Sequence, residues 1–171
     1  AKSTKRKGAA AMATIPRRIY DTCEDMLYQR ESLVKAASER LMSARERAYA
    51  AHGQNLDTSC VASSGDKSGP VERAVFAILQ AEADLCAALK WAEVFSHLDD
   101  IFAGKPEAQI ANAIYVRHVK QKDVAEVMHY DRQSVRRYRD NYVCYCALLA
   151  AEKNLIKVQE DEDDASHIED G

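Results

Sequence analysis

A glutamine and two arginines near residue 135 have the types and spacing needed to read DNA bases. Gln133, Arg136 and Arg137 lie in one stretch of helical periodicity. At about 100° per residue they point away from Val135 and Tyr138, which share the inward face. The guanidinium of arginine can bond guanine bidentately, and the amide of glutamine can bond adenine in the same way. This outward face, which also includes Asp140, therefore predicts direct readout in a major groove.

Basic residues surround this face in the sequence. Residues 117–139 include seven basic and three acidic residues. Such an excess of positive charge suits contacts with phosphates, which position a protein on the duplex without reading its sequence. Besides the three residues of the reading face, the predicted DNA-binding residues are Lys120, Lys122, Arg132, Ser134 and Arg139.

Two helices that cross are needed to present these side chains. We expect them over residues 122–128 and 132–158, joined as a helix-turn-helix and preceded by a helix over residues 107–119. Ala125 provides the small residue required at the crossing, and Asp131 can cap the second helix by accepting from its free N–H groups. Such turns usually have a glycine with positive φ after the first helix, and His129 occupies that position here.

Two long helices are predicted to precede this segment, over residues 16–51 and 70–103. Each begins at a proline, whose fixed φ suits the first turn, and Gly104 is expected to end the second. The first helix has an apolar residue at every seventh position, as in a coiled coil: Tyr20, Leu27, Val34, Leu41 and Ala48. The second has a stripe formed by Val71, Val75, Ile78, Leu85, Leu89, Ala92 and Phe95.

Each stripe must be buried against the other helix or against a second copy of the chain. An intramolecular hairpin and a dimerising rod both satisfy the pattern. The seven-residue recurrence in the first helix leaves more apolar surface than one partner helix needs to cover. We therefore predict a homodimer that associates through this first helix.

The composition indicates an all-α protein, with a helical hairpin or coiled coil followed by the helix-turn-helix. Hydrophobic residues make up 47% of the 171 residues and charged residues 30%, whereas β-branched residues are sparse, which excludes an all-β sandwich or barrel. No apolar run reaches the roughly 18 residues of a membrane span. We expect a soluble, cytoplasmic protein, with no membrane partner and with its five cysteines reduced.

The net charge of −3 conceals a strong difference between the two ends of the chain. Residues 1–18 are basic without an acidic residue, and residues 159–171 are acidic without a basic one. Neither end has enough apolar surface to offset the entropy of ordering it. The expected organisation is a disordered basic tail (1–15), a self-associating hairpin (16–104), a DNA-binding domain (105–158) and a disordered acidic tail (159–171).

The sequence shows no pattern for metal binding or catalysis. Cys144 and Cys146 would point about 200° apart on one helix and cannot share an ion. The histidines lack metal-ligand spacing, and there is no glycine-rich phosphate loop, nucleophile elbow or carboxylate pair. We therefore predict no metal, no cofactor and no enzymatic activity.

The chain resembles the phage late-gene transcriptional activators of the RinA and ArpU type. Gly65-Asp66-Lys67-Ser68-Gly69 matches their S-D-K-x-G signature apart from its first residue, and a long helix follows. Residues 130–135 match their Y-S-x-x-T-V opening of the recognition helix, with Asp131 and Ser134 in place of serine and threonine. Their glycine and tryptophan before the motif are replaced by Val119-Lys120-Gln121. The resemblance implies a helix-turn-helix similar to the C-terminal module of sigma factors, and an activator that engages RNA polymerase.

The predicted function is therefore sequence-specific regulation of transcription, with double-stranded DNA as the partner. Two alternatives use the same features. A small terminase-like packaging protein also joins a helix-turn-helix to an oligomerising coiled coil, and a protein-binding adaptor would use the coiled coil and the acidic tail without binding DNA. The basic face could also be a solvated surface of a simple three-helix bundle. The agreement between the cap, the crossing alanine and the basic face favours DNA binding.

Overall fold

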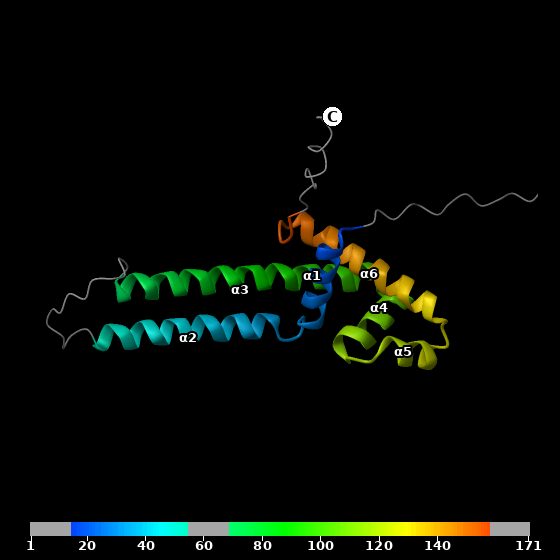
Figure 1. The fold of residues 1–171 in the computed structure, drawn as a ribbon, viewed down its shortest axis with the longest axis horizontal. Helices are drawn as coiled ribbons and strands as arrows, with labels where there is room; N and C mark the ends of the chain where they lie inside the picture. The colour runs from blue at the N-terminus through cyan, green and yellow to red at the C-terminus, as the bar shows by residue number, and fades with distance from the viewer. Residues whose placement is uncertain (1–14, 55–68, 158–171) are drawn as a thin grey trace, which may run out of the picture.

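The computed structural model describes residues 15–54 and 69–157, and every regular element in these two segments is a helix (Figure 1). The helices are α1 (Arg17–Tyr28), α2 (Leu33–Gln54), α3 (Pro70–Ile101), α4 (Pro106–Ala111), the π-helix η1 (Asn112–Val116), α5 (Gln121–Met128) and α6 (Arg132–Glu152). The all-α prediction is confirmed for these residues. The predictions of disordered tails and of a signature around Gly65 fall mainly on residues 1–14, 55–68 and 158–171, which lie outside the described part of the chain.

Prolines mark the helix starts as predicted. Pro16 immediately precedes α1, and Pro70 and Pro106 are the first residues of α3 and α4. Gly104 lies in the turn between α3 and α4 with a φ of +73°, a conformation that glycine adopts at little cost. Within the described residues, no helix has the length and apolar character needed to cross a membrane.

The first long helix is interrupted, so the prediction of one continuous helix over residues 16–51 is wrong. α1 ends at Tyr28 and α2 begins at Leu33. In the turn between them, Arg30 Nη2 donates to Asp99 Oδ2 of α3 at 2.6 Å, and its guanidinium lies 5.5 Å from the centre of the Phe95 ring. Arg30 lies three residues after Leu27 of the seven-residue pattern, on the same face of a helix, where a charge must be paired to be covered. The turn allows that pairing.

Because of this break, the two parts of the apolar stripe are buried in different cores. Cys23 and Leu27 of α1 are fully buried in a large cluster with residues of α3, η1 and α6. Leu41 and Ala44 of α2 form a small second cluster with Ala81 of α3. The stripe is therefore covered in large part within one chain, and the dimer through the first helix stays a prediction.

α2 and α3 lie side by side and run in opposite directions (Figure 1). The buried residues of α3 include Ala81 and Ala88, which are 6% and 3% exposed. The sequence prediction placed Val71, Val75 and Leu89 on this inward face, whereas they are 57%, 49% and 48% exposed. Small side chains let two helices approach closely, and the larger ones are left on the outside.

The large core joins α1, the end of α3 and the helices that follow. Its most buried large side chains include Tyr115 of η1, Tyr142 of α6 and Leu98 of α3. Because α1 and α3 both contribute to it, this core extends across the predicted domain boundary at residues 104 and 105. α6 therefore packs on elements from both sides of that boundary.

Two C-terminal helices end earlier than predicted, and each is followed by a residue with positive φ. The helix expected over residues 107–119 is α4 continued by η1, which stops at Val116 before His118 with a φ of 54°. α6 ends at Glu152 instead of residue 158. Asn154 has a φ of 56° there, and the N–H of Leu155 donates to the carbonyl of Ala150 at 2.9 Å. Asparagine tolerates this conformation and can end a helix as glycine does.

Replacing Leu27 with alanine tests whether α1 belongs to the intrachain core. Leu27 is 0% exposed, so Leu27→Ala should lower the free energy of unfolding by about 2–5 kcal/mol through lost burial and the cavity left behind. Urea unfolding followed by circular dichroism measures this change. Leu148→Ala is the control, because Leu148 is 62% exposed and its truncation should change stability by about 0.5 kcal/mol or less. Equal effects of the two variants would contradict the placement of α1.

Candidate nucleic-acid interface

α5 and α6 are joined by a short turn with the predicted left-handed residue. His129 follows α5 with a φ of 56° and a ψ of 34°, and the N–H of Tyr130 donates to the carbonyl of Ala125 at 3.1 Å. Ala125 is 5% exposed and Val135 is fully buried. The small residue expected where the helices cross is thus buried, and the two helices pack on each other.

Asp131 caps α6 as predicted. Its Oδ1 accepts from the backbone N–H of Ser134 at 2.8 Å, and its Oδ2 accepts from the Ser134 hydroxyl at 2.7 Å. These bonds, above all the one from the hydroxyl, hold the pKa of Asp131 below its ordinary value. The Ser134 hydroxyl proton is therefore engaged in the cap, and the role of Ser134 in DNA binding stays a prediction.

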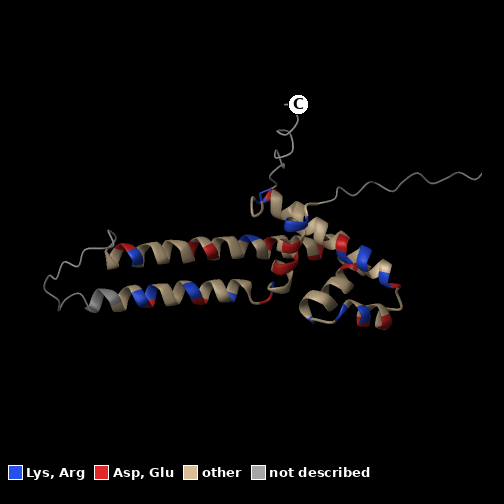
Figure 2. Ribbon diagram, viewed as in Figure 1, with Lys and Arg blue, Asp and Glu red and all other residues tan. Residues whose placement is uncertain are grey.

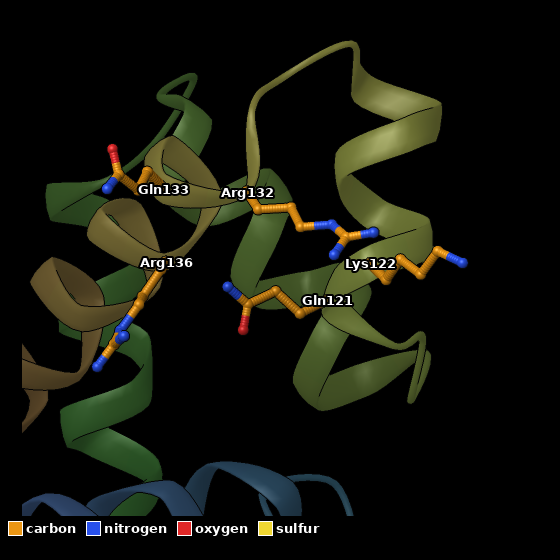
Figure 3. A pocket seen from close by; sticks show the side chains of 5 residues that line it. All are labelled: Gln121, Lys122, Arg132, Gln133 and Arg136. Atoms are coloured by element: carbon orange, nitrogen blue, oxygen red, sulfur yellow. The ribbon is translucent and has the colours of Figure 1, made fainter.

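An open hollow lies between the starts of α5 and α6 (Figure 3). It measures about 390 Å³ and is lined by Gln121, Lys122, Arg132, Gln133 and Arg136. These are three cations and two amides, without a carboxylate. In Figure 3 the Arg132 side chain extends from α6 toward α5, and Gln121 extends from α5 toward α6. The structure therefore brings together four predicted residues and adds Gln121.

Gln121 is a site residue that the sequence prediction missed. α5 begins at Gln121, one residue earlier than expected, and this places its side chain at the mouth between the two helices. Its Oε1 accepts from Arg139 Nη1 at 3.3 Å. Gln121 could have been identified from its position directly after Lys120, because Lys120 is the extended residue that precedes α5. The first residues of a helix present free N–H groups and favour negative charge.

Arg137 and Lys120 are exposed but do not line the hollow. The Arg137 guanidinium lies 5.4 Å from the centre of the Tyr138 ring, on the outer side of α6. Lys120 is the residue immediately before α5. Both remain accessible to a ligand at the rim of the site.

Arg139 is turned inward, contrary to its prediction as a phosphate contact. Its side chain is 23% exposed, and its Nε lies 3.7 Å from Glu24 Oε1 of α1. Its Nη2 also lies 3.4 Å from Asp140 Oδ1, and its guanidinium is 5.8 Å from the centre of the Tyr20 ring. Three residues along the helix from Arg136, it faces α1. The structure thus assigns Arg139 to packing.

Asp140 is held by α1 as well and does not point freely outward as predicted. The Tyr20 hydroxyl donates to Asp140 Oδ1 at 2.6 Å, while Arg136 Nε lies 3.6 Å from Asp140 Oδ2. Nearby, the Tyr115 hydroxyl donates to Glu24 Oε1 at 2.7 Å. Burial, followed by these carboxylate bonds, raises the pKa of both tyrosines. The polar network fixes the first half of α6 against α1 and η1.

The charge around the hollow is mixed but locally basic. Figure 2 shows lysines and arginines along the first half of α6 and on α5, with acidic residues beside them. Asp123 and Glu126 are exposed on α5, yet neither lines the hollow, and Asp131 is engaged in its cap. The exposed cations at the hollow are Lys122, Arg132 and Arg136. A negatively charged ligand would therefore meet positive charge there first.

Arg139→Ala separates a packing role from a phosphate contact. Removing it leaves Glu24 and Asp140 partly buried without their cation, so we expect the free energy of unfolding to fall by about 1–3 kcal/mol. Arg137→Ala removes an equal charge from an exposed position and should change stability by about 0.5 kcal/mol or less. Thermal and urea unfolding measure both. If Arg139→Ala were as stable as Arg137→Ala, the inward network would not support α6.

His129→Gly tests the strain in the turn. The left-handed conformation costs a non-glycine residue about 1–2 kcal/mol, and glycine loses about 0.5–1 kcal/mol through the greater entropy of its unfolded chain. The substitution should therefore raise the free energy of unfolding by about 0.5–1 kcal/mol, measured by urea unfolding. His129→Val should lower it, because a β-branched residue disfavours positive φ. A glycine variant no more stable than the valine variant would contradict the turn geometry.

Comparisons with protein-family models, with curated proteins and with solved structures found no match to this chain. Among the described residues, no group of three or more histidine, cysteine, aspartate or glutamate side chains is placed to hold a metal ion. The residues that line the hollow are therefore the basis for the function proposed below.

Proposed function

We propose that this protein is a sequence-specific DNA-binding regulator of transcription, with α5 and α6 acting as a helix-turn-helix. The observation that carries the proposal is the hollow between the two helix starts. It has three exposed cations, two amides and no carboxylate in its lining. Double-stranded DNA offers the complementary chemistry, since phosphates are anionic and base edges present paired donors and acceptors.

In this proposal the first half of α6 enters the major groove. Gln133 and Arg136 lie on its exposed side near the start of the helix, where recognition helices contact base edges. The side chain of Arg136 is 72% exposed. Its contact with Asp140 joins neighbouring turns of an exposed surface, where such a pair contributes only about 0.3–0.5 kcal/mol. A bidentate bond to guanine can therefore replace it.

The start of α5 is suited to the DNA backbone. Lys122 is exposed in the first turn of α5, and no side chain caps that helix start. Free N–H groups at a helix start together with a nearby lysine form an anion site. Arg132 extends toward the same space from α6 (Figure 3). We therefore assign Lys122 and Arg132 to phosphates, and Gln133 and Arg136 to bases.

The two assignments predict different effects of substitution on DNA binding. After selection of preferred sites from random duplex DNA, Arg136→Ala or Gln133→Ala should cost about 1–3 kcal/mol at the selected site and relax the preference at one base position. Lys122→Ala should weaken selected and random duplexes by the same factor and lower the salt slope by about one unit. Fluorescence anisotropy at several salt concentrations measures both quantities.

Lys35→Ala is the matched control for loss of a positive charge. Lys35 lies on α2 with its side chain 79% exposed, and its removal should leave both affinity and salt slope unchanged. If Arg136→Ala, Gln133→Ala and Lys122→Ala all behaved like this control, the basic face would be only a solvated surface. If all three weakened every duplex equally, α6 would not read bases.

A further inference from the structure

The outer face of α3 has a run of large apolar side chains that the other described residues leave exposed. Val71, Val75, Phe76 and Leu79 are 57%, 49%, 70% and 56% exposed. At about 100° per residue, Val75, Phe76 and Leu79 lie on the side of α3 away from the buried Ala81, whereas Val71 and Leu89 lie at the edge of that side. The cluster between α2 and α3 contains only three buried residues, so this part of the hairpin has little core of its own.

The same face changes from large to small residues along the helix. After Leu79 the exposed residues at matching angles are Ala83 and Cys86. The run is bounded by an exposed acid at one end, Glu72, and by an exposed base at the other, Lys90. We call residues 72–90 on this side the α3 stripe. It is about 27 Å long at 1.5 Å per residue.

The α3 stripe is complementary to itself when two copies run in opposite directions. A two-fold axis near residue 81 places Leu79 opposite Ala83 of a second copy, and Phe76 opposite Cys86. Large side chains then meet small ones, which is how close-packed helices interdigitate. The same axis places Glu72 beside Lys90 of the second copy. Packing and charge are therefore satisfied by one arrangement.

We propose that the protein forms a homodimer through the α3 stripe, with the two α3 helices antiparallel. A two-fold interface uses the same patch on both copies, as this one does. Two hairpins joined in this way place the two α3 helices in the middle and one α2 helix on each outer side, with the shared apolar layer between the two α3 helices. The apolar side chains that the stripe contributes to this layer are Val75, Phe76 and Leu79.

Within the described residues this stripe is exposed to solvent. Lys153, which follows α6, forms an ion pair with Glu93 of α3, just beyond Lys90. α3 packs on α2 and on α6. The dimer does not depend on the proposed DNA binding, because no residue of the hollow belongs to the stripe.

Sedimentation velocity of the full chain across micromolar concentrations tests the dimer. We expect a dimeric mass for the wild type and a monomeric mass for Leu79→Glu, since each copy would bury a carboxylate in the apolar layer. Leu148→Glu is the matched control, because Leu148 of α6 is 62% exposed and Leu79 is 56% exposed. The control should remain dimeric. Circular dichroism should show unchanged helix content in both variants.

A charge exchange tests the antiparallel arrangement. Glu72 and Lys90 are eighteen residues apart on one straight helix, so they cannot touch within a chain. Glu72→Lys and Lys90→Glu should each raise the dimer dissociation constant several-fold, and the double variant should return it to the wild-type value. A monomeric wild type, or Leu79→Glu that stays dimeric, would overturn the interface. Additive losses in the double variant would overturn the antiparallel pairing.

Discussion

The position of the proposed reading helix depends on an ion pair between α6 and α1. Arg139 of α6 faces inward, and Glu24 of α1 is its carboxylate partner from another helix, at 3.7 Å. Tyr20 and Tyr115 complete the contact by donating to Asp140 and Glu24. Because a partly buried charge without its partner is costly, the network favours a single placement of α6. The exposed side of the helix start is fixed as a consequence.

Local patterns of the sequence were sufficient to predict most of the turn between α5 and α6. Asp131 as a cap, Ala125 as the crossing residue and His129 as the left-handed residue all follow from short-range rules, and the structure has all three. These features depend on neighbours within a few residues. The starts of α3 and α4 at Pro70 and Pro106 could be predicted for the same reason.

The failures of prediction concern contacts between residues that are distant in the sequence. Arg136 and Arg139 have the same charge and lie about one turn apart, yet the side chain of Arg136 is 72% exposed and Arg139 lies beside Glu24 of α1. Likewise, the seven-residue pattern continues through the break at Arg30. The pattern gives no indication that Asp99, on another helix, pairs with this arginine. Periodicity predicts that a face is buried, but not what covers it.

The two proposals together constrain how the molecule could engage DNA. Asp99 of α3 accepts from Arg30 and from the hydroxyl of Tyr142, so the direction of α6 is tied to that of α3. An antiparallel pair centred near residue 81 separates the C-terminal ends of the two α3 helices by about 60 Å, at 1.5 Å per residue. Adjacent half-sites on one face of DNA are about 34–36 Å apart. Such a dimer is therefore mismatched to adjacent half-sites, and its two reading helices would engage well-separated sites.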